Sequence, residues 1–249
     1  MKKNSISQIS VSITARFAVV MLLMMATATG WSKRQITEKD MGAYLFTFFN
    51  DATHSLFMAV SYDGYTFTAV NNGEPVISGD SIADQRGIRD PHIYRAPNGR
   101  FYIAMTDLHI YGKEKGLRTT KWERDEKYGW GNNRGLVLMK SDDLIHWTHT
   151  EVRIDKLFPK QFGELGCAWA PETIWDPAVG KLMVYFTIRQ HAGGRTKLYY
   201  CYANDDFTSL ETEPKLLFEY PNEKIQVLDA DICPCLLYTS PSPRDPKTS

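Results

Sequence analysis

The chain has 249 residues, of which 43% are hydrophobic and 23% are charged. This balance is typical of a folded globular protein and excludes a disordered, low-complexity chain. The 29 basic and 29 acidic side chains give a formal net charge of +0. Because the chain has neither a net positive field nor a basic stretch interleaved with aromatics, we expect no nucleic-acid partner.

The first 28 residues are typical of a secretory signal peptide. Lys2 and Arg16 precede an apolar run from Phe17 to Met25, which leads into small residues at 26–28. This run is shorter than the roughly 20 apolar residues that span a bilayer, so we predict cleavage after Ala28. A retained membrane anchor is the alternative, because a long polar stretch precedes the run. In both cases we expect the protein to be secreted or periplasmic.

The four cysteines do not indicate a metal site. They have no zinc-type spacing within a matching set of histidines, and no pair is favoured as a disulfide. The sequence therefore predicts no metal and no cofactor, and it does not specify a structural calcium ion. The cysteines are Cys167, Cys201, Cys233 and Cys235.

An internal repeat predicts the fold. One unit reads as a strand, a tight turn and a second strand, at 90–106 and 170–187, with a third copy beginning at Asp229. Another reads as a strand, an acidic turn and an aromatic edge strand, at 59–67, 138–147 and 200–207. Small antiparallel sheets that recur about every 60 to 80 residues are typical of a β-propeller. A β-sandwich is the alternative.

The repeat stops after Pro234, where the third copy should continue with a turn and a second strand. The residues that follow, 235–249, are rich in Ser and Pro and resemble a translated sequencing adapter. We interpret them as a non-native tail, with a natural Pro/Ser-rich tail as the alternative. The predicted organisation is then a signal peptide at 1–28, a linker at 29–41, a partial propeller at 42–234 and this tail.

Three motifs, in this order along the chain, resemble those of glycoside hydrolase family 43. They are Gly87–Ile93 (GIRDPHI), Cys167–Glu172 (CAWAPE) and Val227–Ile232 (VLDADI). Each motif is weak alone, but the ordered trio on a repeating scaffold is fairly specific. The resemblance implies an all-β fold, a five-bladed β-propeller of which about the first three blades are present. It also implies cleavage of arabinose- or xylose-containing plant polysaccharides.

The resemblance also implies roles for particular carboxylates. Family members use an Asp as general base, an Asp that modulates the pKa of the acid, and a Glu as general acid. Matching by motif gives Asp90 as the base and Asp229 as the modulator, with Asp231 as its rival. In an inverting glycosidase the base and the acid lie about 6.5 to 9.5 Å apart, which leaves room for the attacking water. No position of this chain matches the acid Glu, so we expect the fragment to be inactive.

Four further residues are candidates for substrate binding. Arg89 could orient a carboxylate or bind a hydroxyl group, with a solvated charge as the alternative. Trp169 could stack on a sugar ring, with core packing as the alternative. Glu172 and His109 complete the set. Two other functions stay open: a non-catalytic glycan-binding propeller, and a related five-bladed fructosidase or glycoside phosphorylase.

Overall fold

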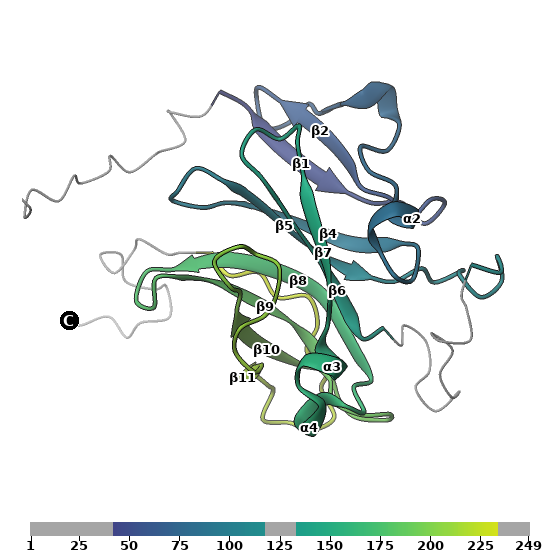
Figure 1. Cartoon of the computed structure of the whole chain (residues 1–249), viewed down its shortest axis with the longest axis vertical. Helices are drawn as coiled ribbons and strands as arrows, with labels where there is room; N and C mark the ends of the chain where they lie inside the picture. Colours follow the sequence, from purple (N-terminus) through teal and green to yellow (C-terminus); the bar gives the residue numbers. More distant parts are fainter. Residues whose placement is uncertain (1–41, 118–132, 234–249) are drawn as a thin grey trace, which may run out of the picture. The chain divides into compact units, whose positions relative to one another are not determined.

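The computed structural model describes residues 42–117 and 133–233 (Figure 1). All of its strands and helices belong to one unit, Ala43–Ser249. The predicted signal peptide, the linker and the tail lie outside the described residues. Within the two described ranges, no helix is long and apolar enough to cross a membrane.

The described residues form three antiparallel sheets, in which consecutive strands are neighbours. The first contains β1 (Tyr44–Phe48), β2 (Phe57–Ser61) and β3 (Thr68–Ala69). The second contains β4 (Ile88–Arg95), β5 (Phe101–Asp107), β6 (Gly135–Ser141) and β7 (Thr148–Arg153). The third contains β8 (Cys167–Asp176), β9 (Lys181–Arg189), β10 (Lys197–Tyr202) and β11 (Lys215–Phe218). Connections hold the short helices η2 (Asn71–Gly73), α2 (Gly79–Ile82), α3 (Ile154–Leu157) and α4 (Pro159–Phe162).

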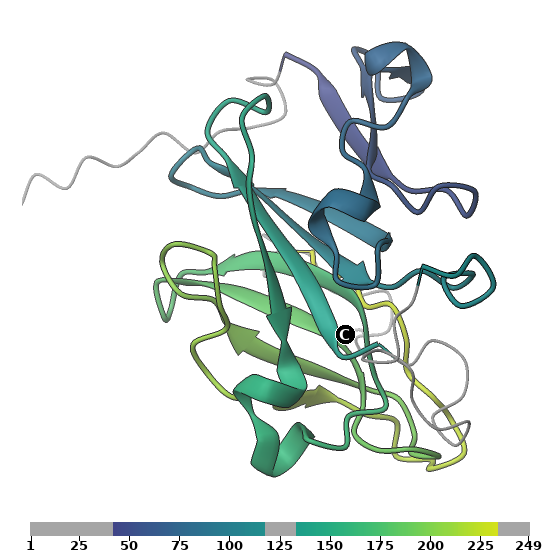
Figure 2. The ribbon, with the colours of Figure 1, turned by 45° about the vertical axis from the view of Figure 1, so that its right-hand side comes forward.

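The sheets pack in the manner of propeller blades. The first strand of each sheet contacts the first strand of the next: β1 contacts β4, and β4 contacts β8. In both ribbon views the second sheet lies between the first, drawn purple to blue, and the third, drawn green (Figures 1 and 2). Up-and-down sheets with adjacent inner strands are the unit of a propeller. The predicted all-β propeller is confirmed, and a β-sandwich does not fit three such sheets.

The middle sheet is apolar on both faces because each face packs against another sheet. Alternate residues of a strand point to opposite sides. In β5, Ile103 and Met105 belong to the core shared with the first sheet, whereas Tyr102 and Ala104 belong to the core shared with the third. This two-sided burial explains the nearly continuous apolar run of β5.

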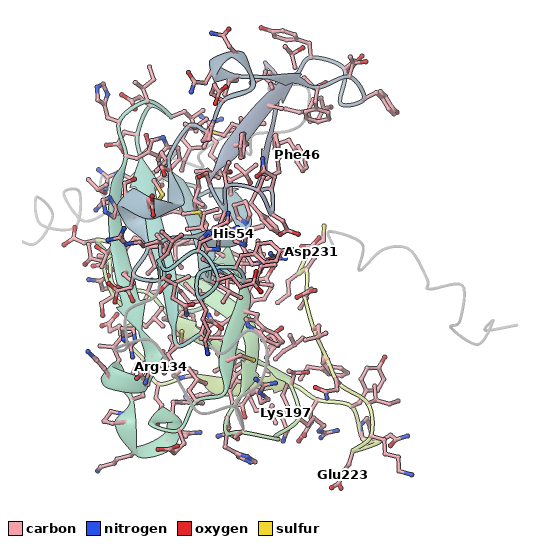
Figure 3. The ribbon with its side chains drawn as sticks, turned by 90° about the vertical axis from the view of Figure 1, so that its right-hand side faces the viewer. Phe46, His54, Arg134, Lys197, Glu223 and Asp231 are labelled. Atoms are coloured by element: carbon pink, nitrogen blue, oxygen red, sulfur yellow. The ribbon has the colours of Figure 1, made fainter. Side chains whose placement is uncertain are left out.

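The first sheet has one buried and one exposed face. Leu45 packs against the core shared with the second sheet, whereas its neighbour Phe46 is 51% exposed (Figure 3). The Phe46 ring lies 5.4 Å from that of Phe48 and 5.7 Å from that of Phe67, measured between ring centroids. Exposed apolar patches are typical of protein–protein or ligand-binding surfaces.

The third repeat copy differs from its prediction. The strand expected at Asp229 is irregular, because the described residues offer no second strand of that unit with which it could form a ladder of hydrogen bonds. Its backbone nevertheless has the same conformation as the other two copies at one residue, Asp229. Asp229 has a φ of 50°, close to the 51° of Asp90 and the 44° of Ala170.

The core between the second and third sheets gives a test of this packing. Phe162 of α4 is fully buried there, with its ring 5.9 Å from that of Tyr199. Since Phe162→Ala would leave a cavity, we expect the free energy of unfolding to fall by about 3 to 5 kcal/mol. Ile145→Ala, at a side chain that is 76% exposed, is the control and should change it by less than about 0.5 kcal/mol. Equal effects in urea denaturation would contradict this packing.

Candidate active site

A β-bulge interrupts the first strand of the second and third sheets at two of the predicted motifs. The register with the neighbouring strand shifts between Arg89 and His92 in β4, and between Trp169 and Glu172 in β8. Asp90 sits within the first bulge in the left-handed backbone region, which costs a non-glycine residue about 1 to 2 kcal/mol. Backbone strain of this kind clusters at functional sites.

The bulges bring predicted site residues to one cavity. The cavity has a volume of about 260 Å³. It unites the predicted base, the predicted pKa modulator and two predicted binding residues from separate repeat units. Its lining consists of Arg89, Asp90, Leu108, Trp169, Leu228 and Asp229.

A buried threonine positions the predicted base. The Thr106 hydroxyl donates a hydrogen bond to Asp90 Oδ2 at 2.9 Å and accepts one from the Ala170 backbone N–H at 2.9 Å. Thr187, at the matching position of β9, accepts the N–H of Asp229 at 3.2 Å. Each threonine therefore hydrogen-bonds the backbone of the residue with positive φ in the next repeat unit, Ala170 or Asp229. Sequence reasoning missed both, although they occupy aligned positions of the two strand–turn–strand copies.

Burial sets the titration of Asp90. Burial raises the pKa of its carboxyl, and the nearby charge of Asp229 acts in the same direction. The hydrogen bond from Thr106 and the positive charge of Arg89 lower it, but they do not offset the burial. Asp90 is thus a more basic carboxylate than one in water, which suits a group that accepts a proton.

Arg89 is held at the cavity by two contacts. Its Nη1 lies 2.5 Å from Asp51 Oδ1, and its guanidinium lies 4.5 Å from the centre of the Phe49 ring. Its side chain is only 17% exposed. Arg89 is therefore an oriented donor and not a solvated surface charge.

A second polar group lies two residues beyond the bulges. The Tyr185 hydroxyl donates to Glu172 Oε2 at 2.5 Å and accepts the Ile232 N–H at 3.0 Å. His92 Nε2 lies 3.9 Å from the same Glu172 oxygen. Burial raises the pKa of Glu172, and the neighbouring Asp231 raises it further. Glu172 and Asp231 thus form this second group and do not line the cavity.

The protonation of His92 follows from its contacts. Burial lowers the pKa of its imidazole. Its Nδ1 accepts the backbone N–H of Thr173 at 3.2 Å. A neutral ring that accepts at Nδ1 carries its proton on Nε2, which faces Glu172.

His109 lies apart from the cavity lining. It is 2% exposed and stacks on His54, with ring centroids 4.0 Å apart. A Cβ atom on Gly87 would lie 2.7 Å from His109 Cβ and 2.8 Å from His54 Cβ, so this close packing requires glycine. Burial lowers the pKa of His54 to about 4, which leaves it neutral. His109 was predicted to contact the substrate, but in the structure it is buried against His54 and does not line the cavity.

The described residues show no metal centre. In 42–117 and 133–233, no three His, Cys, Asp or Glu side chains form a set suited to a metal ion. Cys167 and Cys201 are buried free thiols in this part of the chain. Cys235 lies outside it.

Comparison with known families identifies the chain. Residues 39–236 match the model of the glycosyl hydrolase 43-related family, described as "Probable glycosyl hydrolase domain". The chain belongs to this family. A stretch of 128 residues is 29% identical to an alpha-L-arabinofuranosidase of Bifidobacterium longum subsp. longum and covers 51% of this chain and 11% of that protein.

Solved structures with a similar chain path include two arabinose-related enzymes. An exo-1,5-alpha-L-arabinanase from a bovine ruminal metagenomic library is 16% identical, with a TM-score of 0.45, over 73% of this chain and 51% of that one. An alpha-L-arabinofuranosidase from Lactobacillus brevis is 18% identical, with a TM-score of 0.45, over 72% of this chain and 51% of that one. The family 43-related chain thus spans about half the length of these two structures.

Thr106 gives a test of the site's architecture. Thr106→Val keeps the side-chain shape but removes the hydroxyl that joins Asp90 Oδ2 to the Ala170 N–H. We expect the free energy of unfolding to fall by about 1 to 3 kcal/mol, the usual penalty for an unsatisfied buried group. Thr106→Ser keeps the hydroxyl and serves as the control. Denaturation curves that show the same loss for both variants would contradict a role for this hydroxyl.

Proposed function

We propose that the intact protein is a glycoside hydrolase that cleaves arabinose- or xylose-containing plant polysaccharides with inversion of configuration. One observation carries the proposal: Asp90 and Asp229 come from two separate repeat units and line the same cavity as Trp169. Membership of the glycosyl hydrolase 43-related family supports the reaction class. The neighbours' names, arabinofuranosidase and arabinanase, support the substrate class.

Asp90 is the general base in this proposal. Inversion requires a carboxylate that takes a proton from a water molecule on one face of the sugar. Asp90 has the half-buried, hydrogen-bonded carboxyl that such a role needs, since Thr106 fixes one oxygen at 2.9 Å. The second oxygen is then the one to face the water. Asp229, whose charge reaches Asp90, is the carboxylate that tunes the site's protonation.

The general acid is proposed to come from outside the described residues. Glu172 lies in the second motif and is a rival for this role. Its carboxylate accepts a hydrogen bond from the Tyr185 hydroxyl at 2.5 Å, and it does not line the cavity. A proton donor must reach the glycosidic oxygen on the side opposite the base. We therefore expect this chain alone to bind but not to cleave its substrate.

Trp169 and Arg89 are the proposed substrate contacts. The Trp169 indole lines the cavity, and the Arg189 guanidinium lies 5.6 Å from its ring centre. Aromatic faces stack on the apolar faces of sugar rings. Arg89 adds oriented N–H donors that suit sugar hydroxyls. Export of the protein, predicted from residues 1–28, is part of the same proposal.

Asp90→Asn tests the proposed base in the intact protein. The amide keeps the shape but cannot accept the proton, so hydrolysis of aryl arabinofuranosides and xylosides should fall at least about a hundredfold. Sugar binding should be retained. Asp80→Asn, at an exposed acid in α2, is the control and should leave the rate unchanged.

Two results would contradict the proposal. Unchanged hydrolysis in the Asp90→Asn variant would exclude Asp90 as the base. A product that retains its anomeric configuration, followed by proton NMR directly after cleavage, would exclude inversion. A parent protein that binds these sugars but never cleaves them would favour a glycan-binding propeller.

A further inference from the structure

Three carboxyl groups meet next to the segment that delivers Asp90 to the cavity. Asp84 follows α2, Asp107 ends β5, and Glu151 lies in β7. Asp107 is completely buried, Glu151 is partly buried and Asp84 is exposed. Asp107 pairs directly with Ile88, two residues before Asp90. The cluster therefore adjoins the proposed site but takes no part in lining its cavity.

The hydrogen bonds of this cluster leave two oxygens without a donor. Asp107 Oδ1 accepts the backbone N–H of Gln85 at 2.8 Å. Asp107 Oδ2 and Glu151 Oε1 are both buried, and no described residue donates a hydrogen bond to either. A Cβ atom placed on Gly135 would lie 3.3 Å from the first and 3.0 Å from the second, so both oxygens border the same glycine. The two carboxyls interact through a side-chain hydrogen bond, which requires a proton on one of them.

The neighbouring arginines do not cancel the negative charge of the Asp107 and Glu151 carboxyls. Arg153 binds both oxygens of Asp155 at 2.9 and 2.7 Å, and Arg134 lies 3.3 Å from the same carboxylate. Burial raises the pKa of Glu151 most, and its side-chain hydrogen bond with Asp84 and the charges of Asp107 and Asp84 raise it further. Arg153 lowers it, but by less. These effects raise the pKa of Glu151 above neutrality, and burial raises that of Asp107 as well.

We propose that Glu151 is a protonated positioning residue whose carboxylic acid donates its hydrogen to the Asp107 carboxylate. The bonded pair holds the turn before β4 in place. Asp107 anchors that turn through Gln85, and the next residue, Leu108, donates its N–H to the Gly87 carbonyl at 3.0 Å. Arg89 and Asp90 follow Gly87 by two and three residues. The positioning role rests on the proposed function of Asp90, whereas the shared proton does not.

The pH dependence follows from linkage. The folded state keeps a proton on Glu151 that the unfolded chain releases near the ordinary pKa of Glu. Folding is therefore weakened as the pH rises between the unfolded and the folded pKa of this group. An amide at 151 carries no such proton and escapes the loss. The difference between the two proteins grows with pH if Glu151 is protonated and is constant if it is ionised.

The first experiment compares Glu151→Gln with the wild-type intact protein by urea denaturation. Between about pH 6 and pH 9, the ratio of their unfolding equilibrium constants should change by about tenfold per pH unit, in favour of the variant. Glu74→Gln, at an exposed acid, is the matched control and should show a constant ratio. A constant ratio for Glu151→Gln would overturn the shared proton, whether or not the protein is an enzyme.

The second experiment tests the positioning role through the rate of hydrolysis. Glu151→Gln can still donate to Asp107, so its kcat at neutral pH should stay near the wild-type value and should fall less on the alkaline side. Glu151→Leu cannot donate, and its kcat should fall by about ten- to a hundredfold through misplacement of Asp90, with KM less affected. Identical pH profiles for wild type and Glu151→Gln, or an unchanged kcat in folded Glu151→Leu, would overturn this role. Absence of hydrolysis in the wild type would reject the proposed function and leave the first experiment to decide on the proton.

Discussion

The hydrogen bond between a threonine hydroxyl and the bulge of the next repeat unit is the contact on which the site depends. Thr106 is fully buried, and it joins β5 to the backbone of Ala170 and to the side chain of Asp90. One hydroxyl therefore links the packing of two sheets to the position of a carboxylate. Since hydroxyl groups both donate and accept, threonine can satisfy both neighbours at once. Thr187 repeats the backbone half of this arrangement at Asp229.

The bulges convert a regular sheet into a site. In an undisturbed strand, successive side chains alternate between the two faces. The left-handed residue in β4 breaks that alternation, and it directs Arg89 and Asp90 to the same cavity. The residue two positions later then joins a separate polar group, as His92 does with Glu172. The strained residue thus separates the polar side chains that line the cavity from those of the His92–Glu172 group. The surrounding packing holds this residue in its strained conformation.

Much of the fold could be predicted because it repeats at the level of sequence. The turn at Gly99 and its copy at Gly180 both adopt the positive φ that glycine allows, and they join the strand pairs as expected. The motifs at Asp90 and Asp229 also meet at one cavity. These features depend on the local order of residues, which can be compared directly between the aligned copies of a repeat.

The rest depended on contacts that residue order does not specify. Leu108 and His109 are adjacent, yet Leu108 lines the cavity and His109 is buried against His54. Sequence alone does not tell which of two neighbours faces a site once a strand has ended. The pairing of Glu151 with Asp107 was equally hidden, because it depends on the registers of three strands around Gly135.

Asp90 and Asp229 line one cavity, which we propose binds the sugar. The most direct measurement is a crystal structure of the intact Asp90→Asn protein with an arabinose- or xylose-containing oligosaccharide. We expect a sugar ring against Trp169, with a water molecule bound between residue 90 and the anomeric carbon and with Asp229 beside the same ring. A sugar bound elsewhere, or a cavity in which residues 90 and 229 face different ligands, would contradict it.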